Sequence, residues 1–240
     1  MTKNIVNTAL VLLGTGTLLT GCDFEQPATD CFVQGSTSWA MKYDLVDEPR
    51  DANGDACEPG APLAELVGVY KFVNPDTDTA QLALRPAGLV GSAAVADESS
   101  ESTDQTALGS LGEQDAEDFC TATNFNSAFV NVAASEGAPE NTIRYEFSNV
   151  RVYSAPSAPG TQIMGQFTYT NNGCTGTYVM RGLWPAVGCY TDSTDPLESC
   201  GEGSGMNPEA AVMCQPIHPD DPEDPTYGYC VPAKEIPSFK

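Results

Sequence analysis

The sequence predicts an all-β chain: an antiparallel sandwich or barrel with a loop-rich C-terminal appendage stapled by disulfides. Three observations support this fold class. Apolar side chains recur at every second position in several short segments, which is the period of a half-buried strand. Turn-forming Asn, Asp, Pro and Gly residues separate these segments. No convincing amphipathic helix follows the first 21 residues. Periodicity alone does not distinguish a sandwich from a barrel.

The first strands are expected between residues 39 and 85. Residues 39–45 alternate strictly, with Trp, Met, Tyr and Leu on one face. Residues 67–73 are rich in β-branched and aromatic side chains. The turn Asn74-Pro75-Asp76 then leads to a return strand over residues 81–85. The next stretch, residues 92–118, has no Lys or Arg and few large apolar groups, so we expect a mobile acidic loop there.

Further strands are expected over residues 119–123, 128–132 and 143–152. In the last of these the apolar phase slips at Ser148-Asn149, which predicts a bulge or turn. The clearest hairpin follows, because two alternating runs flank Asn171-Asn172-Gly173, whose Asn and Gly tolerate positive φ.

The C-terminal part differs in composition, which divides the chain into a β domain over residues 31–188 and an appendage over residues 189–240. The appendage is rich in Cys, Pro and Gly and has few apolar runs. Disulfides rather than a core are therefore expected to hold it.

The N-terminus has the order of a secretory signal peptide: a basic residue, Lys3, then an apolar run too short to cross a bilayer, then small residues. Leu19-Thr20-Gly21-Cys22 resembles the lipobox of bacterial lipoproteins. That resemblance implies a type II signal peptide at residues 1–21, which is removed. It also implies that Cys22 receives diacylglycerol on its thiol and an acyl group such as palmitate on its amine.

This resemblance places the chain in the bacterial cell envelope, on the outer membrane or the periplasmic face of the inner membrane. Residues 22–30 would form the lipid anchor and a tether. The eight residues after Cys22 span at most about 28 Å, so the folded body would lie near the bilayer.

Eight cysteines remain once Cys22 is assigned to lipid, and an even set in an exported chain predicts four disulfides. They are Cys31, Cys57, Cys120, Cys174, Cys189, Cys200, Cys214 and Cys230. The pairings favoured are Cys31–Cys57 and Cys120–Cys174, with the last four paired among themselves. The whole-chain pattern, including Gly182-Leu183-Trp184-Pro185-Ala186-Val187 before a Cys, resembles Cys-rich lipoproteins of myxobacterium-like genomes, a resemblance that implies no particular function.

Composition and motifs argue against several functions. A formal net charge of −23 should repel nucleic acid. The single histidine, His218, lies in an acidic Pro-rich loop with no evident partner for catalysis. No nucleophile-elbow, zincin, Rossmann or phosphate-loop motif occurs. Trp39 and Trp184 could stack on sugars or peptides, but core positions are the simpler interpretation. No catalytic residue is assigned, and the chain is expected not to be an enzyme.

The sharpest local motif is Asp51-Ala52-Asn53-Gly54-Asp55. The side-chain oxygens of Asp51, Asn53 and Asp55 resemble the start of a calcium-binding loop. The rest of that pattern is missing, because Ala56 and Leu63 replace its Gly and Glu. A polar turn centred on Asn53-Gly54 is the alternative.

The leading hypothesis is a non-enzymatic envelope lipoprotein that acts as a binding or structural module, with the membrane as one partner and an envelope protein or glycan as another. One alternative is a calcium-stabilised adhesion or carbohydrate-binding module. Another is a carboxylate-based hydrolase, which requires two facing carboxylates in a cleft.

Overall fold

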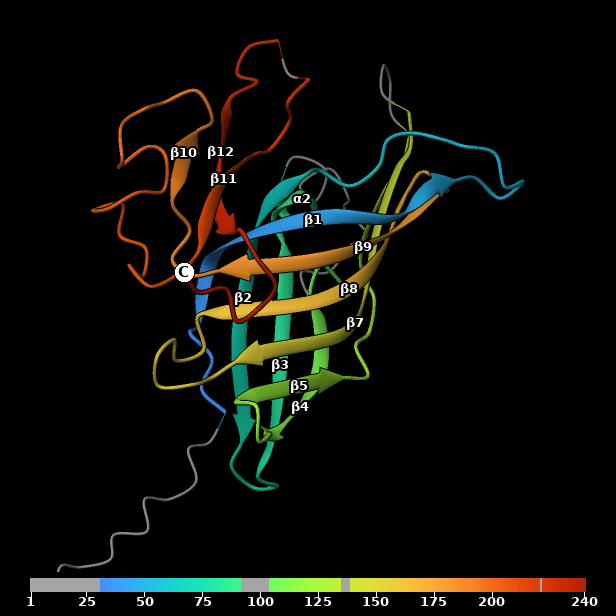
Figure 1. Ribbon diagram of the computed structural model, residues 1–240. Helices are drawn as coiled ribbons and strands as arrows, with labels where there is room; N and C mark the ends of the chain where they lie inside the picture. Colours follow the sequence, from blue (N-terminus) through green and yellow to red (C-terminus); the bar gives the residue numbers. More distant parts are fainter. Residues whose placement is uncertain (1–30, 92–103, 135–138, 221) are drawn as a thin grey trace, which may run out of the picture.

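The computed structural model describes residues 31–91, 104–134, 139–220 and 222–240 (Figure 1). Within these residues the only helix, α2, spans Ala87–Val90. The strands are β1 (Ser36–Arg50), β2 (Ala64–Asn74), β3 (Thr79–Pro86), β4 (Ala107–Gln114), β5 (Phe119–Thr123), β6 (Ala128–Val132), β7 (Asn141–Tyr153), β8 (Gln162–Asn171), β9 (Cys174–Leu183), β10 (Gly188–Tyr190), β11 (Val212–Pro216) and β12 (Tyr227–Pro232). The predicted all-β fold is confirmed.

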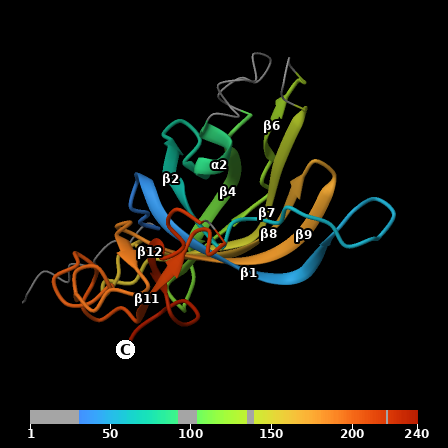
Figure 2. The same cartoon turned by 90° about the horizontal axis from the view of Figure 1, so that it is seen from above.

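The strands β1 to β9 form one antiparallel sheet that closes into a barrel. Its order is β5-β4-β3-β2-β1-β9-β8-β7-β6, and β5 also pairs with β7. Residues 150–153 of β7 pair with β5, and residues 141–145 pair with β6. β5 and β6 therefore lie one after the other along the same edge of β7. The sheet curves back on itself (Figure 2). The structure thus decides for the barrel over the sandwich.

One face of each strand fills the barrel interior. Trp39, Met41 and Tyr43 of β1 are buried, as their alternation predicts. Leu45, the next in that series, is 53% exposed, because β1 there has passed beyond its pairing with β2. Aromatic rings dominate the interior, and Tyr145 stacks on Phe167 with ring centroids 5.6 Å apart. Burial of such large apolar surfaces is the main favourable term in folding.

Two predicted irregularities are confirmed. The β7–β8 register shifts between Ser148 and Arg151, and Asn149 has φ of 51°, so a bulge accounts for the change of apolar phase. The β8–β9 hairpin turns at Asn172-Gly173, where φ is 51° and 84°. Two central residues with positive φ are the requirement of a type I′ turn.

The predicted acidic loop over residues 92–118 is partly wrong. Residues 92–103 lie outside the described residues, but Ala107–Gln114 form β4. Its buried positions are Ala107, Gly109 and Leu111, and two of these three are too small to produce a strong apolar signal. Gly109 has a specific role, since a Cβ there would lie 2.7 Å from the ring of Phe125.

Four disulfides form, but two of the favoured pairings are wrong. Cys31 pairs with Cys120, and Cys57 pairs with Cys174. The barrel brings the segment before β1 onto β5 and the β1–β2 loop onto the start of β9, so each of these cysteines meets a partner that is distant in sequence. The last four do pair among themselves, as Cys189–Cys214 and Cys200–Cys230.

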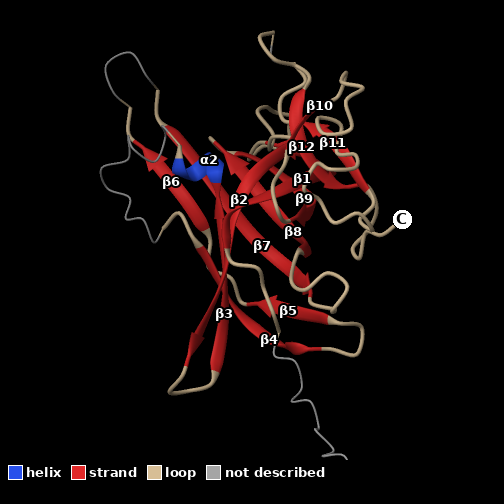
Figure 3. Cartoon of the chain, turned by 90° about the vertical axis from the view of Figure 1, so that its left-hand side faces the viewer, coloured by secondary structure: helices blue, strands red, loops and turns tan. Residues whose placement is uncertain are grey.

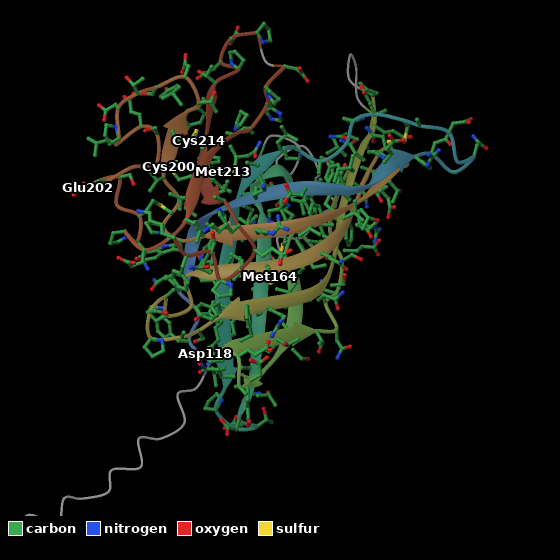
Figure 4. All side chains as sticks on the ribbon, in the orientation of Figure 1. Asp118, Met164, Cys200, Glu202, Met213 and Cys214 are labelled. Carbon is green, nitrogen blue, oxygen red and sulfur yellow. A yellow bond between two sulfur atoms is a disulfide. The ribbon has the colours of Figure 1, made fainter. Side chains whose placement is uncertain are left out.

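The appendage packs on the outside of the barrel. β10, β12 and β11 form a three-stranded sheet next to β1 (Figure 2). Ala40, which faces outward on β1, is fully buried. The C-terminal tail also joins the barrel, because the backbone N–H of Ser238 donates to the side-chain oxygen of buried Gln162 at 2.7 Å. Cys200, Cys214 and Met213 all lie within the appendage (Figure 4).

Residues 1–30, which contain the predicted signal peptide, Cys22 and the predicted tether, lie outside the described residues. In the part of the chain that is described, no helix has the length and apolar character needed to cross a bilayer.

The disulfide map yields the first prediction. Replacing Cys57 and Cys174 together by Ala should lower the free energy of unfolding by about 2–5 kcal/mol, because the bridge restricts a long loop of the unfolded chain. Urea unfolding measures this loss. The matched variant lacking Cys189 and Cys214, which are separated by 25 residues instead of 117, should lose less. Peptide mapping that found Cys31 linked to Cys57 would contradict the map.

Candidate functional site

We define the lower end of the barrel as the end where β2 turns into β3 (Figure 3). The residues at this end line a pocket. Its volume is about 460 Å³, and its walls come from β2, β3, β4 and the segment that begins at Cys31. This volume lies within the range of small-molecule sites. The pocket is therefore the candidate site among the described residues.

A row of apolar side chains forms one wall of this pocket. Val73 of β2 pairs with Ala80 of β3, and Ala80 pairs with Leu111 of β4. Directly paired residues in antiparallel strands project from the same face of the sheet. The three side chains line the pocket together, so the barrel pleat itself makes a continuous apolar strip.

Lys71 and Cys31 form another part of the lining. Lys71 lies two residues before Val73, so it projects from the same face of β2. Its Nζ donates a hydrogen bond of 2.6 Å to the carbonyl oxygen of Cys31. Cys31 is itself tied to β5 through its disulfide with Cys120. The ammonium of Lys71 is thereby held by a fixed backbone oxygen.

Three carboxylates complete the lining: Asp78, Glu113 and Asp115. Asp115 is already engaged, because it accepts the backbone N–H of Phe119 at 2.9 Å and pairs with Arg151 at 3.0 Å. These contacts, first of all the hydrogen bond from Phe119, lower the pKa of Asp115. Among the described residues, no ion pair involves Asp78 or Glu113. Two carboxylates of the pocket are therefore not neutralised by an ion pair.

A second polar cluster lies inside the barrel, around Glu65 of β2. The hydroxyls of Tyr43 and Tyr145 donate to its Oε1 at 2.6 and 2.9 Å, and the backbone N–H of Gly88 donates to its Oε2 at 3.1 Å. Burial raises the pKa of Glu65, although these three hydrogen bonds act in the opposite direction. Burial also raises the pKa of Tyr43 and Tyr145, with the nearby Glu65 carboxylate adding to the effect.

The hydrogen bonds of Glu65 to the described residues all come from hydroxyl and amide donors. Its hydrogen-bonding partners are two phenols and one amide, and no other carboxylate is buried among the described residues. Its contacts join β1, β2, β7 and α2. The cluster therefore cross-links these four elements inside the barrel by hydrogen bonds to Glu65, and we call it the staple at Glu65.

Sequence reasoning assigned neither Glu65 nor the pocket. Glu65 could have been found, because it is in phase with the buried Val67 and Val69, and a carboxylate at an inward position of a strand is unusual. No comparable pattern in the sequence predicts the pocket. Asp78 and Glu113 become neighbours of one cavity only through the β2–β3–β4 pairing.

The Asp51–Asp55 segment forms a hydrogen-bonded turn. Oδ1 of Asp51 accepts the backbone N–H groups of Asn53 and Asp55 at 2.8 and 3.0 Å, and its Oδ2 accepts the side-chain amide of Asn53 at 3.2 Å. These bonds, first of all that from Asp55, lower the pKa of Asp51. The guanidinium of Arg50 donates to the carbonyl oxygen of Gly54. This geometry suits the polar-turn alternative, and calcium binding by Asp51, Asn53 and Asp55 stays a prediction.

The remaining candidate residues from the sequence are the two tryptophans, His218 and the cysteines of the appendage. Trp39 is fully buried and donates its Nε1–H to the carbonyl oxygen of Gln34. Trp184 is half-buried against the core, and His218 is exposed. The sulfur atoms of Cys189, Cys200 and Cys230 lie within 4.8 Å of one another. All three belong to disulfides, so they offer no thiolate to a metal.

Comparison with known proteins identifies relatives of this chain. The MlpA family model matches residues 37–185, which correspond to the barrel from β1 to the end of β9. A protein of Myxococcus xanthus named "Putative lipoprotein MlpA" is 64% identical over 241 residues, and the match covers 100% of both chains. No solved structure matches the chain.

The buried carboxyl yields a prediction on pH dependence. The pKa of Glu65 is raised in the folded chain above its ordinary value of 4.5. Folding therefore favours the protonated form, and the stability of the wild type should fall as the pH rises from 4.5 through the raised value. Glu65→Gln cannot ionise, so this fall should disappear. Urea unfolding between pH 4.5 and 8 measures the slope.

The slope matters more than the absolute stability, because the Gln amide offers one acceptor oxygen where the carboxylate offers two. Glu113→Gln, which changes an exposed carboxylate, serves as the matched control and should keep the wild-type slope. Equal slopes in wild type and Glu65→Gln would contradict the assignment.

The Asp51 turn yields a prediction on calcium. Thermal melts in excess calcium and in chelator should coincide, because backbone and amide N–H groups already occupy the Asp51 oxygens and a guanidinium lies beside the turn. A calcium-dependent rise in the melting temperature that Asp51→Ala abolishes would establish the metal-binding alternative instead.

Proposed function

Because this chain belongs to the MlpA family, we propose that it is a lipid-anchored, non-enzymatic binding module of the bacterial cell envelope, and that its ligand site is the pocket at the lower end of the barrel. The relative from Myxococcus xanthus is named a lipoprotein and matches the whole chain. The lipobox-like Leu19-Thr20-Gly21-Cys22 supplies the matching attachment residue, Cys22.

The observation that carries this proposal is the place of the pocket relative to the attachment point. Cys31 lines the pocket, and only residues 23–30 separate it from Cys22. Those eight residues span at most about 28 Å. A lipid on Cys22 would therefore hold the pocket close to the membrane, where it could sample envelope components.

The chemistry of the pocket favours binding over catalysis. The buried carboxyl with a raised pKa, Glu65, lies in the barrel interior and does not line the pocket. The lining carboxyl with a shifted pKa, Asp115, is held ionised by Phe119 and Arg151. A general acid or base works best with a pKa near the working pH. The pKa of Asp115 is lowered, which moves it further from neutral pH.

The anchor is tested by replacing Cys22 with Ala in the full precursor. Wild type should carry a diacylglyceryl cysteine at its mature N-terminus, visible by mass spectrometry, and should sediment with membranes. Cys22→Ala should lose the lipid and leave the membrane fraction, unless it is retained as an uncleaved precursor, which the mass distinguishes. Thr29→Ala, in the tether, is the control and should behave as wild type. A mature wild-type chain without lipid on Cys22 would overturn the anchoring proposal.

A further inference from the structure

We infer that the pocket at the lower end of the barrel binds an organic ammonium group, a monocation carried on a small apolar body. This inference rests on the proposed function, in which the pocket is the ligand site, and it adds the chemical class of the ligand. Its basis is the combination of a cavity, an apolar wall and an unbalanced charge.

The charge of the lining is the first argument. Arg151, which lies outside the pocket lining, pairs with Asp115 and also with Glu117. The remaining charged groups are Asp78, Glu113 and Lys71, with formal charges that leave one net negative charge. Lys71 forms no ion pair with either carboxylate, since its ammonium is held by the carbonyl oxygen of Cys31. A ligand with a single positive charge matches this excess, and an anion does not.

The apolar wall is the second argument. The paired side chains of Val73, Ala80 and Leu111 present hydrocarbon beside the carboxylates. A fully hydrated inorganic cation gains nothing from that surface. An ammonium on an alkyl or ring group buries its hydrocarbon there and places its N–H donors toward Asp78 and Glu113.

The geometry also argues against a divalent metal. Calcium requires several oxygens gathered around one point. Among the described residues, the one group of three or more Cys, His, Asp or Glu ligand atoms within 4.8 Å of one another consists of disulfide sulfurs in the appendage. The pocket carboxylates form no such group of three, and they line a cavity of about 460 Å³, which suits a ligand larger than an ion.

The ammonium could belong to a free amine or to the ethanolamine headgroup of a phospholipid. Both present the same chemistry, and the anchor keeps the pocket within reach of headgroups. The two sources are separated by the lipid composition used in the experiment below.

The test uses the mature lipidated chain in nanodiscs of choline phospholipid, observed through the NMR signals of the Val73 and Leu111 methyl groups. Cyclohexylamine, cyclohexanol and cyclohexanecarboxylate share one ring and differ in charge. The amine should shift both signals saturably and bind more tightly than the alcohol or the carboxylate. Higher salt should weaken this binding.

Asp78→Asn and Glu113→Gln should each weaken the amine up to about fivefold, the range of a solvent-exposed ion pair. The control variants Glu202→Gln and Asp220→Asn change exposed carboxylates of the appendage (Glu202 is labelled in Figure 4) and should bind as wild type. In discs that contain ethanolamine phospholipid, methyl shifts without added amine would identify the headgroup as the source.

Equal affinity for amine and alcohol, or unchanged affinity after both pocket carboxylates are neutralised, would overturn the ammonium inference and leave the pocket as a binding site. Methyl signals that respond to none of the three compounds would overturn the inference and the pocket together. The membrane-anchor proposal is tested separately, by the Cys22→Ala variant.

Discussion

The barrel depends on the length of β7 and on its bulge. β7 spans Asn141–Tyr153 and pairs with β8 along one edge, while β6 and β5 occupy successive parts of the other edge. The bulge at Ser148–Asn149 lies between these two parts and increases the local twist. The β5–β7 pairing covers strand edges that would otherwise invite association with other chains, whereas β6 stands at the end of the sheet order and, among the described strands, pairs with β7 alone. Without residues 150–153 of β7, the sheet would lack the pairing with β5 that closes it.

Closure also explains why the disulfides join distant segments. Cys31–Cys120 ties the beginning of the described chain to β5, and Cys57–Cys174 ties the β1–β2 loop to the β8–β9 hairpin. Each bridge fastens an irregular segment to a strand that closure has already placed. The two remaining bridges lie in the appendage, whose small core contains Cys189, Cys200 and Cys230, so disulfides supply stability where apolar surface is scarce. The chain is thereby held at both of its loop-rich parts.

Charge is distributed unevenly between the inside and the outside of this acidic protein. Among the described residues the interior holds one carboxyl, that of Glu65, which accepts hydrogen bonds from three donors and whose pKa burial raises. The other acidic groups of the described chain remain at or near the surface, where water solvates them. At the lower end of the barrel two of them, Asp78 and Glu113, border an apolar strip. Unbalanced charge beside hydrocarbon in a cavity is what distinguishes this pocket from the rest of the acidic surface.

The sequence alone determined the β class, the bulge at Ser148–Asn149, the Asn172-Gly173 hairpin and the presence of four disulfides, because period, turn chemistry and cysteine parity are local or additive properties. It did not reveal β4, whose buried face includes the small residues Ala107 and Gly109, the latter packed against Phe125. The barrel closure, the partners of Cys31 and Cys57, the staple at Glu65 and the pocket were decided only by tertiary structure. Each depends on which distant strands become neighbours, and that choice is a property of the closed sheet, which no single segment encodes.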